Sequence, residues 1–266
     1  MKFGIIHYRA PGATLEAFLD YAAVTGFDAV ELRAADIWPE GEGDGQKRAA
    51  QVRKMLDERR LGLAAVSAGN DFVVLDEEAI GHQIDRMGQL SRLATIAGAK
   101  VLRTEGGRRK AQVPPNREGE AIAACLKRCV AFAHRDDIVL AVDNHGQVTN
   151  DPQLLIGVLR AVGSDRVGAN LDTANFRAAG HSVEACRAIY DQVAPLVLHT
   201  HMKDCIGQLP DYHCQVLGEG EVDLNHAVTA LKRAGYAGTY TAEWEGQGDS
   251  AAAYAACLAW MKQHID

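Results

Sequence analysis

The 266-residue chain lacks several features that mark specialised classes of protein. Its six cysteines form no Cys-x-x-Cys pair, and a chain of this length buries enough surface to fold without disulfides or a structural metal. No run of apolar residues is long enough to span a membrane. The amino terminus has neither the apolar core nor the cleavage site of a signal peptide, so we expect a cytoplasmic protein.

The chain also lacks an excess of basic residues. Its 28 lysines and arginines against 35 acidic residues give a formal net charge of −7. Nucleic-acid binding depends on basic side chains that neutralise phosphates, and attraction to anionic membranes depends on polybasic segments. We therefore expect no nucleic-acid or membrane partner. A hydrophobic content of 47% with 24% charged residues is typical of a soluble globular protein.

Short apolar segments alternate with longer amphipathic ones along the whole chain. The short segments have the length and β-branched content of buried parallel strands. They are Phe3–His7, Ala29–Leu32, Leu63–Ser67, Lys100–Thr104, Ile138–Asp143, Val167–Asp172, Leu196–His201 and Thr239–Glu243. The longer segments repeat apolar residues every three or four positions, as amphipathic helices do. They are Thr14–Thr25, Gln46–Arg60, Glu77–Ala97, Glu118–Arg135, Pro152–Ala161, Val183–Gln192, Leu224–Ala234 and Ser250–His264.

Eight such strand–helix pairs predict an α/β fold, a closed (β/α)₈ TIM barrel that forms a single domain over residues 1–266. The alternative is a doubly wound open sheet. That fold favours a glycine-rich phosphate turn after the first strand, and the segment Tyr8–Gly12 does not have this pattern. Two segments, Trp38–Gly45 and Gly106–Arg117, show neither pattern and are expected to be loops.

Polar residues lie at or next to the carboxyl end of every predicted strand. They are His7, Glu31, Ser67, Glu105, Asp143, Asp172, His201 and Glu243. In TIM barrels this end of the strands carries the chemistry. A buried strand rarely ends in an ionisable residue without a reason, so a whole ring of polar residues at one mouth favours an active site.

Four of these residues end consecutive predicted strands and predict a metal site: Asp143, Asp172, His201 and Glu243. Three carboxylates and an imidazole brought together would repel strongly without a cation. Oxygen-rich ligands with one imidazole suit Mn²⁺ best, while Mg²⁺, Co²⁺ and Zn²⁺ are also compatible. The alternative interpretation is a set of unrelated polar strand ends.

Side-chain alternation adds neighbours to this site. His199 and Lys203 share the face of His201, and His145 shares the face of Asp143. His199 then lies beneath the metal or belongs to an inner layer of the barrel. Lys203 contacts a substrate oxygen or pairs with Asp204 or Asp172. The basic segment Gly106–Lys110 either binds a phosphate or carboxylate or is a solvated loop.

Several motifs follow one another in the order of a known family. His199–Asp204 is similar to an H-x-H-x-K-D segment, Leu217–Asp223 to L-G-x-G-x-V-D, Asn170–Asn175 to L-D-x-x-N, and Gly235–Glu245 to G-Y-x-G…E-x-E. Val30–Arg33 and Asp143–Gly146 match strands two and five of the same pattern. Together they resemble the sugar phosphate isomerase/epimerase superfamily, the xylose isomerase-like TIM barrels. The resemblance covers essentially the whole chain.

The resemblance implies one divalent metal held at the positions of Asp143, Asp172, His201 and Glu243, and a keto-sugar or polyol-like substrate. It also makes a homo-oligomer possible. One position departs from the pattern, because the sugar epimerases usually have glutamate where this chain has Asp143. The aspartate is one carbon shorter, about 1.5 Å in reach. It can still ligate a metal, and whether it reaches a substrate carbon stays open.

Our leading hypothesis is a divalent-metal-dependent isomerase or epimerase that acts on a keto or aldehyde sugar through a metal-stabilised enediolate. Glu243 would remove a proton, and Asp143 or His145 would return one. Substrate binding is expected from His7, Glu31, Arg33, Glu105, His199 and Lys203.

The alternative is a metal-dependent lyase or dehydratase that acts on a keto sugar, a 3-keto-glycoside or an inosose with the same site. It needs one base and one acid instead of two opposed bases. A DNA-repair endonuclease is disfavoured by the net charge of −7. A non-catalytic sugar-binding protein is disfavoured by the four intact ligand positions.

Overall fold

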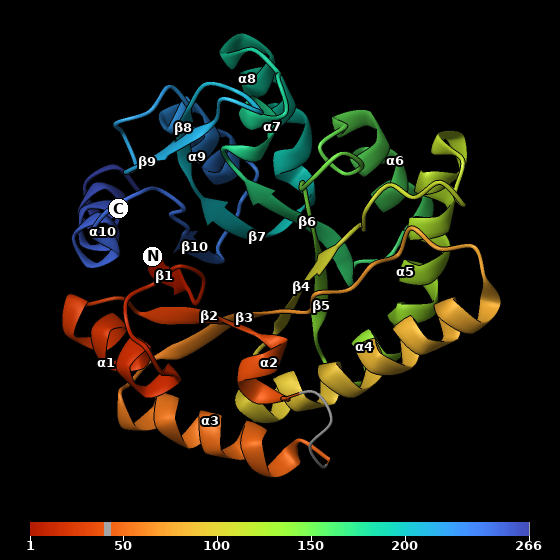
Figure 1. The fold of residues 1–266 in the computed structure, drawn as a ribbon, viewed down its shortest axis with the longest axis horizontal. Coiled ribbons are helices and arrows are strands. Elements are labelled where there is room, and N and C mark those ends of the chain that lie inside the picture. Colours follow the sequence, from red (N-terminus) through yellow and green to blue (C-terminus); the bar gives the residue numbers. More distant parts are fainter. Residues whose placement is uncertain (40–43, 266) are drawn as a thin grey trace.

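The structure, a computed structural model, describes residues 1–39 and 44–265. Eight parallel strands close into a barrel in the order β1-β10-β7-β6-β5-β4-β3-β2 (Figure 1). These strands are β1 (Lys2–Ile6), β2 (Ala29–Arg33), β3 (Gly62–Ser67), β4 (Val101–Glu105), β5 (Val139–Asp143), β6 (Val167–Asp172), β7 (Val197–Met202) and β10 (Thr239–Ala242). The predicted single-domain TIM barrel is confirmed. Residues 40–43, within the loop predicted over residues 38–45, lie outside the described part of the chain.

Helices surround the barrel, and each predicted helix is present (Figure 1). They are α1 (Leu15–Thr25), α3 (Gln46–Glu58), α4 (Glu77–Ala97), α5 (Glu118–Arg135), α6 (Pro152–Val162), α8 (Val183–Val193), α9 (Leu224–Arg233) and α10 (Ser250–Ile265). Side chains of Asp151, Ser182 and Asp223 accept backbone N–H groups in the first turns of α6, α8 and α9, so each helix start is encoded locally. None of the described helices is long and apolar enough to cross a membrane.

Five small elements were not expected from the sequence: two single-turn helices, a hairpin and two 3₁₀ turns. The single-turn helix α2 (Ala34–Ile37) directly follows β2. A second single-turn helix, α7 (Asn175–Ala178), begins shortly after β6 ends at Asp172. An antiparallel hairpin of β8 (Asp204–Ile206) and β9 (His213–Gln215) follows β7. Short 3₁₀ turns precede α5 at Pro115–Arg117 and β7 at Ala194–Leu196. The first three elements lie at the carboxyl end of the barrel and shape its mouth.

The glycine-rich segment after the hairpin is organised by one buried carboxylate. Asp204 accepts backbone N–H groups from Gly218, Gly220 and Val222 at 2.9, 3.0 and 3.1 Å. A Cβ atom at Gly220 would lie 2.1 Å from Asp204 Oδ1, so only glycine allows this approach. The segment therefore shapes a turn at the mouth.

Buried polar side chains fill the carboxyl half of the barrel interior. Glu31 on β2 and His199 on β7 belong to strands that are not neighbours in the barrel, yet Nε2 of His199 lies 2.7 Å from a Glu31 oxygen. The contact crosses the interior, so both side chains point inward. Both are fully buried or nearly so, at 0% and 1% exposed. The interior at this level is an ionic network.

Candidate active site

Three of the four predicted metal ligands meet at the mouth of the barrel. One ligand atom from each of Asp172, His201 and Glu243 lies within 4.8 Å of the other two. The residues come from the ends of β6, β7 and β10, which are neighbours in the barrel. Glu243 lies one residue past β10, and its backbone N–H still donates to Met202 of β7 at 3.0 Å, which extends the sheet to this position.

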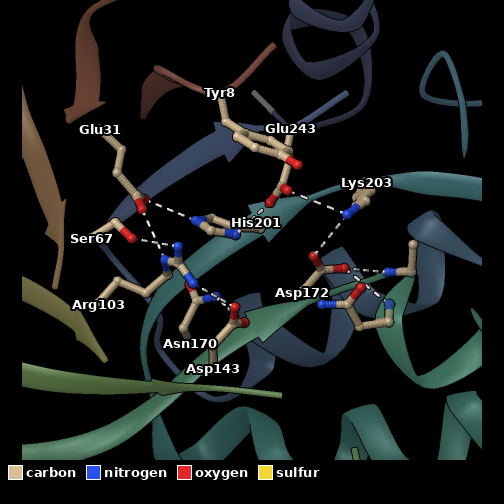
Figure 2. Close-up of polar contacts among 12 residues, drawn as sticks. Tyr8, Glu31, Ser67, Arg103, Asp143, Asn170, Asp172, His201, Lys203 and Glu243 are labelled. Carbon is tan, nitrogen blue, oxygen red and sulfur yellow. Dashed lines mark hydrogen bonds and ion pairs between the residues drawn. The ribbon is translucent and has the colours of Figure 1, made fainter. Parts of the chain in front are cut away.

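The imidazole of His201 is oriented by Glu31 (Figure 2). Nε2 of His201 lies 2.8 Å from Glu31 Oε2, and Nδ1 faces Glu243 Oε2 at 2.7 Å without the geometry of a hydrogen bond. A histidine that donates one ring N–H to a carboxylate presents its other nitrogen as a metal ligand. His201 therefore offers Nδ1 to the cluster.

The carboxylate of Asp172 is fixed through one oxygen only. Its Oδ1 accepts the backbone N–H groups of Ala174 and Asn175 at 2.8 and 3.0 Å, at the start of α7. Its Oδ2 is buried and has no hydrogen-bond partner among the described residues. Buried polar atoms are almost always hydrogen-bonded. Oδ2 of Asp172 and Nδ1 of His201 have ionic neighbours but no hydrogen bond within the described part of the chain, and a bound cation would interact with both.

Among the described residues, Lys203 is the lysine or arginine that contacts the cluster directly. Its Nζ lies 3.3 Å from Glu243 Oε1, 2.9 Å from Glu245 Oε2 and 3.8 Å from Asp172 Oδ2. Burial disfavours the charge, but these carboxylates outweigh it and raise the pKa of Lys203 well above its usual value. Of the two interpretations left open from the sequence, the structure shows carboxylate pairing.

Burial and neighbouring carboxylates favour a proton on one carboxylate of the cluster. Burial, with the nearby charges of Glu243 and Asp143, raises the pKa of Asp172 to about 7 in spite of Lys203. Burial acts in the same direction on Glu243, but Lys203 and His201 outweigh it and lower its pKa. A carboxylic acid that is half protonated near neutral pH is a favourable place for a divalent cation, which would replace the proton.

Asp143, the fourth predicted ligand, is held away from this group by two other side chains (Figure 2). Arg103 Nη1 donates to Asp143 Oδ2 at 2.8 Å, and Asn170 Nδ2 donates to Oδ1 at 2.7 Å. Each oxygen therefore accepts one hydrogen bond, and the three-residue group of Asp172, His201 and Glu243 does not include Asp143. Metal ligation by Asp143 stays a prediction.

Arg103 was missed in the analysis of the sequence, although it is central to the site. Besides Asp143, its guanidinium donates to Glu31 Oε1 at 3.0 Å and to Ser67 Oγ at 2.6 Å. The residue lies two positions before Glu105 on β4, so strand alternation places both on one face. That alternation was the available signal, and reading only the last residue of each strand overlooked it.

A cavity of about 300 Å³ opens above the cluster, here called the inner cavity. It is lined by Ile6, Tyr8, Arg33, Ser67, Arg103, Glu105, Arg108, Asp143, His145, Asp172, Asn175, Glu243 and Glu245. Of the residues predicted to bind substrate, Arg33 and Glu105 reach its wall. The predicted proton donor His145 also lines it, and its ring has no partner among the residues that the structure describes.

Four other predicted substrate-binding residues do not line the inner cavity. Glu31 and His199 lie beneath His201 and form its support. Lys203 is buried under Glu243 and Glu245. His7 stacks on Phe18 with ring centroids 4.4 Å apart, and its Nδ1 contacts Asp36 at 2.9 Å. These positions fit support of the site better than contact with substrate.

Comparison with known proteins agrees with this architecture. A profile of the xylose isomerase-like TIM barrel family matches residues 19–264. The chain belongs to this family. No curated protein matches the sequence.

Solved structures of xylose isomerase-like barrels superpose over almost the entire chain. A xylose isomerase domain protein from Alicyclobacillus acidocaldarius subsp. acidocaldarius is 20% identical, with 100% of this chain and 98% of its own covered and a TM-score of 0.79. The IOLI protein with a bound zinc atom is 18% identical, covers 100% and 98%, and has a TM-score of 0.82. A D-psicose 3-epimerase determined with D-fructose is 17% identical, covers 100% and 99%, and has a TM-score of 0.80. At these identities the likeness establishes the fold.

Proposed function

We propose that the protein is a divalent-metal-dependent isomerase or epimerase of a keto or aldehyde sugar. The observation that carries this proposal is the buried group of Asp172, His201 and Glu243, in which two ligand atoms have no hydrogen-bond partner. Two carboxylates and one imidazole suit Mn²⁺, with Mg²⁺, Co²⁺ or Zn²⁺ as alternatives. The zinc atom of the IOLI structure and the sugar epimerases of the same fold support the proposal.

The metal would be held by Asp172, His201 and Glu243. A divalent cation bound there would polarise a substrate carbonyl and acidify the adjacent C–H bond. Glu243 borders the inner cavity and stays ionised, so it is the base that takes this proton. Lys203, 3.3 Å from Glu243 Oε1, fixes the orientation of that carboxylate. The fully buried support of Glu31 and His199 keeps His201 in one orientation.

The second proton transfer falls to His145 in this account. Its ring lines the inner cavity and is exposed, whereas Asp143 accepts hydrogen bonds from Arg103 and Asn170, which hold its carboxylate in place. His145 can therefore return a proton to the neighbouring carbon, which is an isomerisation, or to the other face of the same carbon, which is an epimerisation. The proton that Glu243 removes balances the proton that is returned.

One observation favours a lyase or dehydratase as the second candidate. With Asp143 paired to Arg103, the proposed base is the carboxylate Glu243, and the proposed acid is His145, whose ring has no partner among the described residues. Elimination needs this unequal pair: the base removes a proton, the adjacent bond to the leaving group breaks, and the acid protonates the departing oxygen. The substrate class would then be a keto sugar, a 3-keto-glycoside or an inosose.

Proton NMR in D₂O with the Mn²⁺-loaded protein separates the two candidates. The substrates are a panel of ketoses, aldoses, inososes and 3-keto-glycosides. Deuterium entering beside the carbonyl, with the product otherwise unchanged in mass, supports the isomerase or epimerase. Loss of water or of an aglycone supports the lyase. Absence of metal binding in an accompanying titration contradicts both.

A further inference from the structure

The loop that follows β4 carries three consecutive basic residues, Arg108, Arg109 and Lys110, and the structure gives them different environments. Arg109 makes two hydrogen bonds, at 2.8 and 3.1 Å, to the fully buried carboxylate of Glu118. Lys110 Nζ lies 2.9 Å from Asp71 Oδ2 and donates to the Val73 carbonyl at 3.0 Å. Arg108 is exposed and has no partner among the residues that the structure describes.

The loop itself is held in one conformation. The N–H of Phe72 donates to the Gly106 carbonyl at 3.0 Å. Gly107 has a φ of 123°, and a Cβ atom there would lie 2.2 Å from Asp71 Oδ1 and 2.9 Å from Val73 N. Only glycine fits so close an approach of two backbone segments. Arg109 and Lys110 anchor the loop, so Arg108 projects from a fixed base.

Arg108 stands between two adjoining cavities. It lines the inner cavity, which also contains Asp172 and Glu243. It also lines a neighbouring cavity of about 360 Å³, here called the outer cavity. The outer cavity is formed by Glu105, Gly106, Gly107, Arg108, Arg109, His145, Gly146 and Gln147, from the loops after β4 and β5. Glu105 and His145 line both cavities as well.

The two cavities together offer room for a substituted sugar. Small-molecule sites commonly enclose roughly 300–1,000 Å³, so the inner cavity of about 300 Å³ lies at the lower limit. A sugar whose carbonyl faces Glu243 would lie in the inner cavity, and a substituent that enters the outer cavity would lie beside Arg108, which lines both.

The other arginines of the two cavities are already paired. Arg103 holds Asp143, Arg109 holds Glu118, and Arg33 lies 3.3 Å from Asp36. Arg108 is the arginine of these walls that is left without a carboxylate among the described residues. An arginine fork suits the oxygen pairs of a carboxylate or phosphate. The charge at this point of the cavity complements an anion.

We propose that Arg108 binds an anionic substituent, a phosphate or a carboxylate, of the sugar that the protein acts on, and that this substituent lies in the outer cavity. The proposal rests on the proposed function for the identity of the sugar end. It narrows the substrate class from neutral sugars to sugar phosphates or sugar acids. The binding of the anion itself can be tested without turnover.

The deciding experiment uses the metal-free full-length protein and inorganic phosphate or acetate as the probe. The Arg108 Nε–H signal is assigned by its loss in Arg108→Gln and followed by NMR during each titration. The exposed Arg160 of α6 has no partner among the described residues, so Arg160→Gln is the charge-matched control. We expect a saturable shift of this signal in wild type and Arg160→Gln. A response to phosphate alone assigns a phosphate, and a response to acetate alone assigns a carboxylate.

Absence of a saturable Arg108 shift with both probes overturns the proposal. Phosphate binding that persists undiminished in Arg108→Gln also overturns it and identifies an adventitious ion only.

Kinetics then separate this proposal from the proposed function. A ketohexose, its 6-phosphate and the matching hexuronate are compared by deuterium exchange. We expect Arg108→Gln to raise KM for the preferred anionic sugar about 10- to 100-fold, the cost of a charged hydrogen bond, with a smaller effect on kcat. Arg108→Lys should restore part of the loss. If Arg108→Gln slows exchange on the neutral sugar as much as exchange on the anionic sugars, the anion subsite is contradicted and the proposed function stands. If Arg108 binds anions but the protein catalyses exchange on no sugar, the anion subsite stands and the proposed function is contradicted.

Discussion

Arg103 Nη1 lies 2.8 Å from Asp143 Oδ2, and this pair joins two strand ends at the mouth of the barrel. The same guanidinium also holds the buried carboxylate of Glu31 at 3.0 Å. Arg103 thus connects the support beneath His201 with the carboxylate that was expected to complete the metal site. Its position has consequences for stability, metal binding and the choice of catalytic base.

Replacing Arg103 should destabilise the protein strongly. Arg103→Met leaves Glu31, which is 0% exposed, and Asp143 without their shared cation. Removing one partner of a buried ion pair costs about 3–5 kcal/mol. Urea unfolding of the metal-free protein measures the change. Arg53→Met, which breaks an exposed pair with Asp57, is the control and should cost under about 1 kcal/mol. Equal stability of both variants would show that Arg103 is not a structural centre of the site.

Removing the charge of Glu31 should weaken metal binding, although Glu31 acts only through His201. Glu31 Oε2 lies 2.8 Å from His201 Nε2, and it belongs to the support of the imidazole. Loss of such a partner typically lowers metal affinity by about 10- to 100-fold. Competition against a chromophoric chelator gives the affinity of Glu31→Gln, with Glu77→Gln, an exposed residue of α4, as control. An affinity equal to wild type would mean that Glu31 does not orient His201.

The stability of the metal-free protein should depend on the protonation of Asp172. Burial raises the pKa of Asp172 from 3.8 to about 7, so the folded protein favours the protonated form. The stabilisation is complete below the pKa of the unfolded chain and is lost as the pH rises through about 7. The loss amounts to at most about 1.4 kcal/mol per pH unit in this window.

Asp172→Asn isolates this effect because asparagine does not titrate. In chelator, the unfolding free energy of wild type should fall relative to that of Asp172→Asn as the pH rises from 4 toward 7. The relative loss is at most ~1.4 kcal/mol per pH unit. Saturating Mn²⁺ should reverse the trend for wild type, since the cation replaces the proton. A difference that is flat with pH would contradict the raised pKa.

The sequence predicted the frame of the site because its signals are local. The length and β-branched content of the short segments and the apolar spacing of the longer ones predicted the barrel, and the strand-end residues Asp172, His201 and Glu243 lie together as expected. The engagement of Asp143 was not predictable in this way. It depends on the register that pairs Glu105 with Asp143 across β4 and β5 and so brings Arg103 within reach. Register is a property of two strands, and neither carries it alone.

The hairpin of β8 and β9 could not be predicted from the sequence pattern for a different reason. Each strand has three residues, too few to show an alternation. Its position is set instead by Asp204, which binds backbone groups 14 to 18 residues away along the chain. Likewise, the sequence left open whether Lys203 pairs with a carboxylate, and only the fold shows Glu245 2.9 Å from it.

The central claim is that Glu243 is the base of a metal site, and Glu243→Gln tests it most directly. Two quantities are measured on the same preparation: deuterium incorporation beside the substrate carbonyl, and Mn²⁺ affinity by titration. Glu120→Gln on the surface of α5 serves as control. The account predicts that exchange falls by about 10²- to 10⁴-fold, the usual contribution of a general base, while Mn²⁺ affinity falls by a smaller factor. Exchange at the wild-type rate in Glu243→Gln would contradict the account.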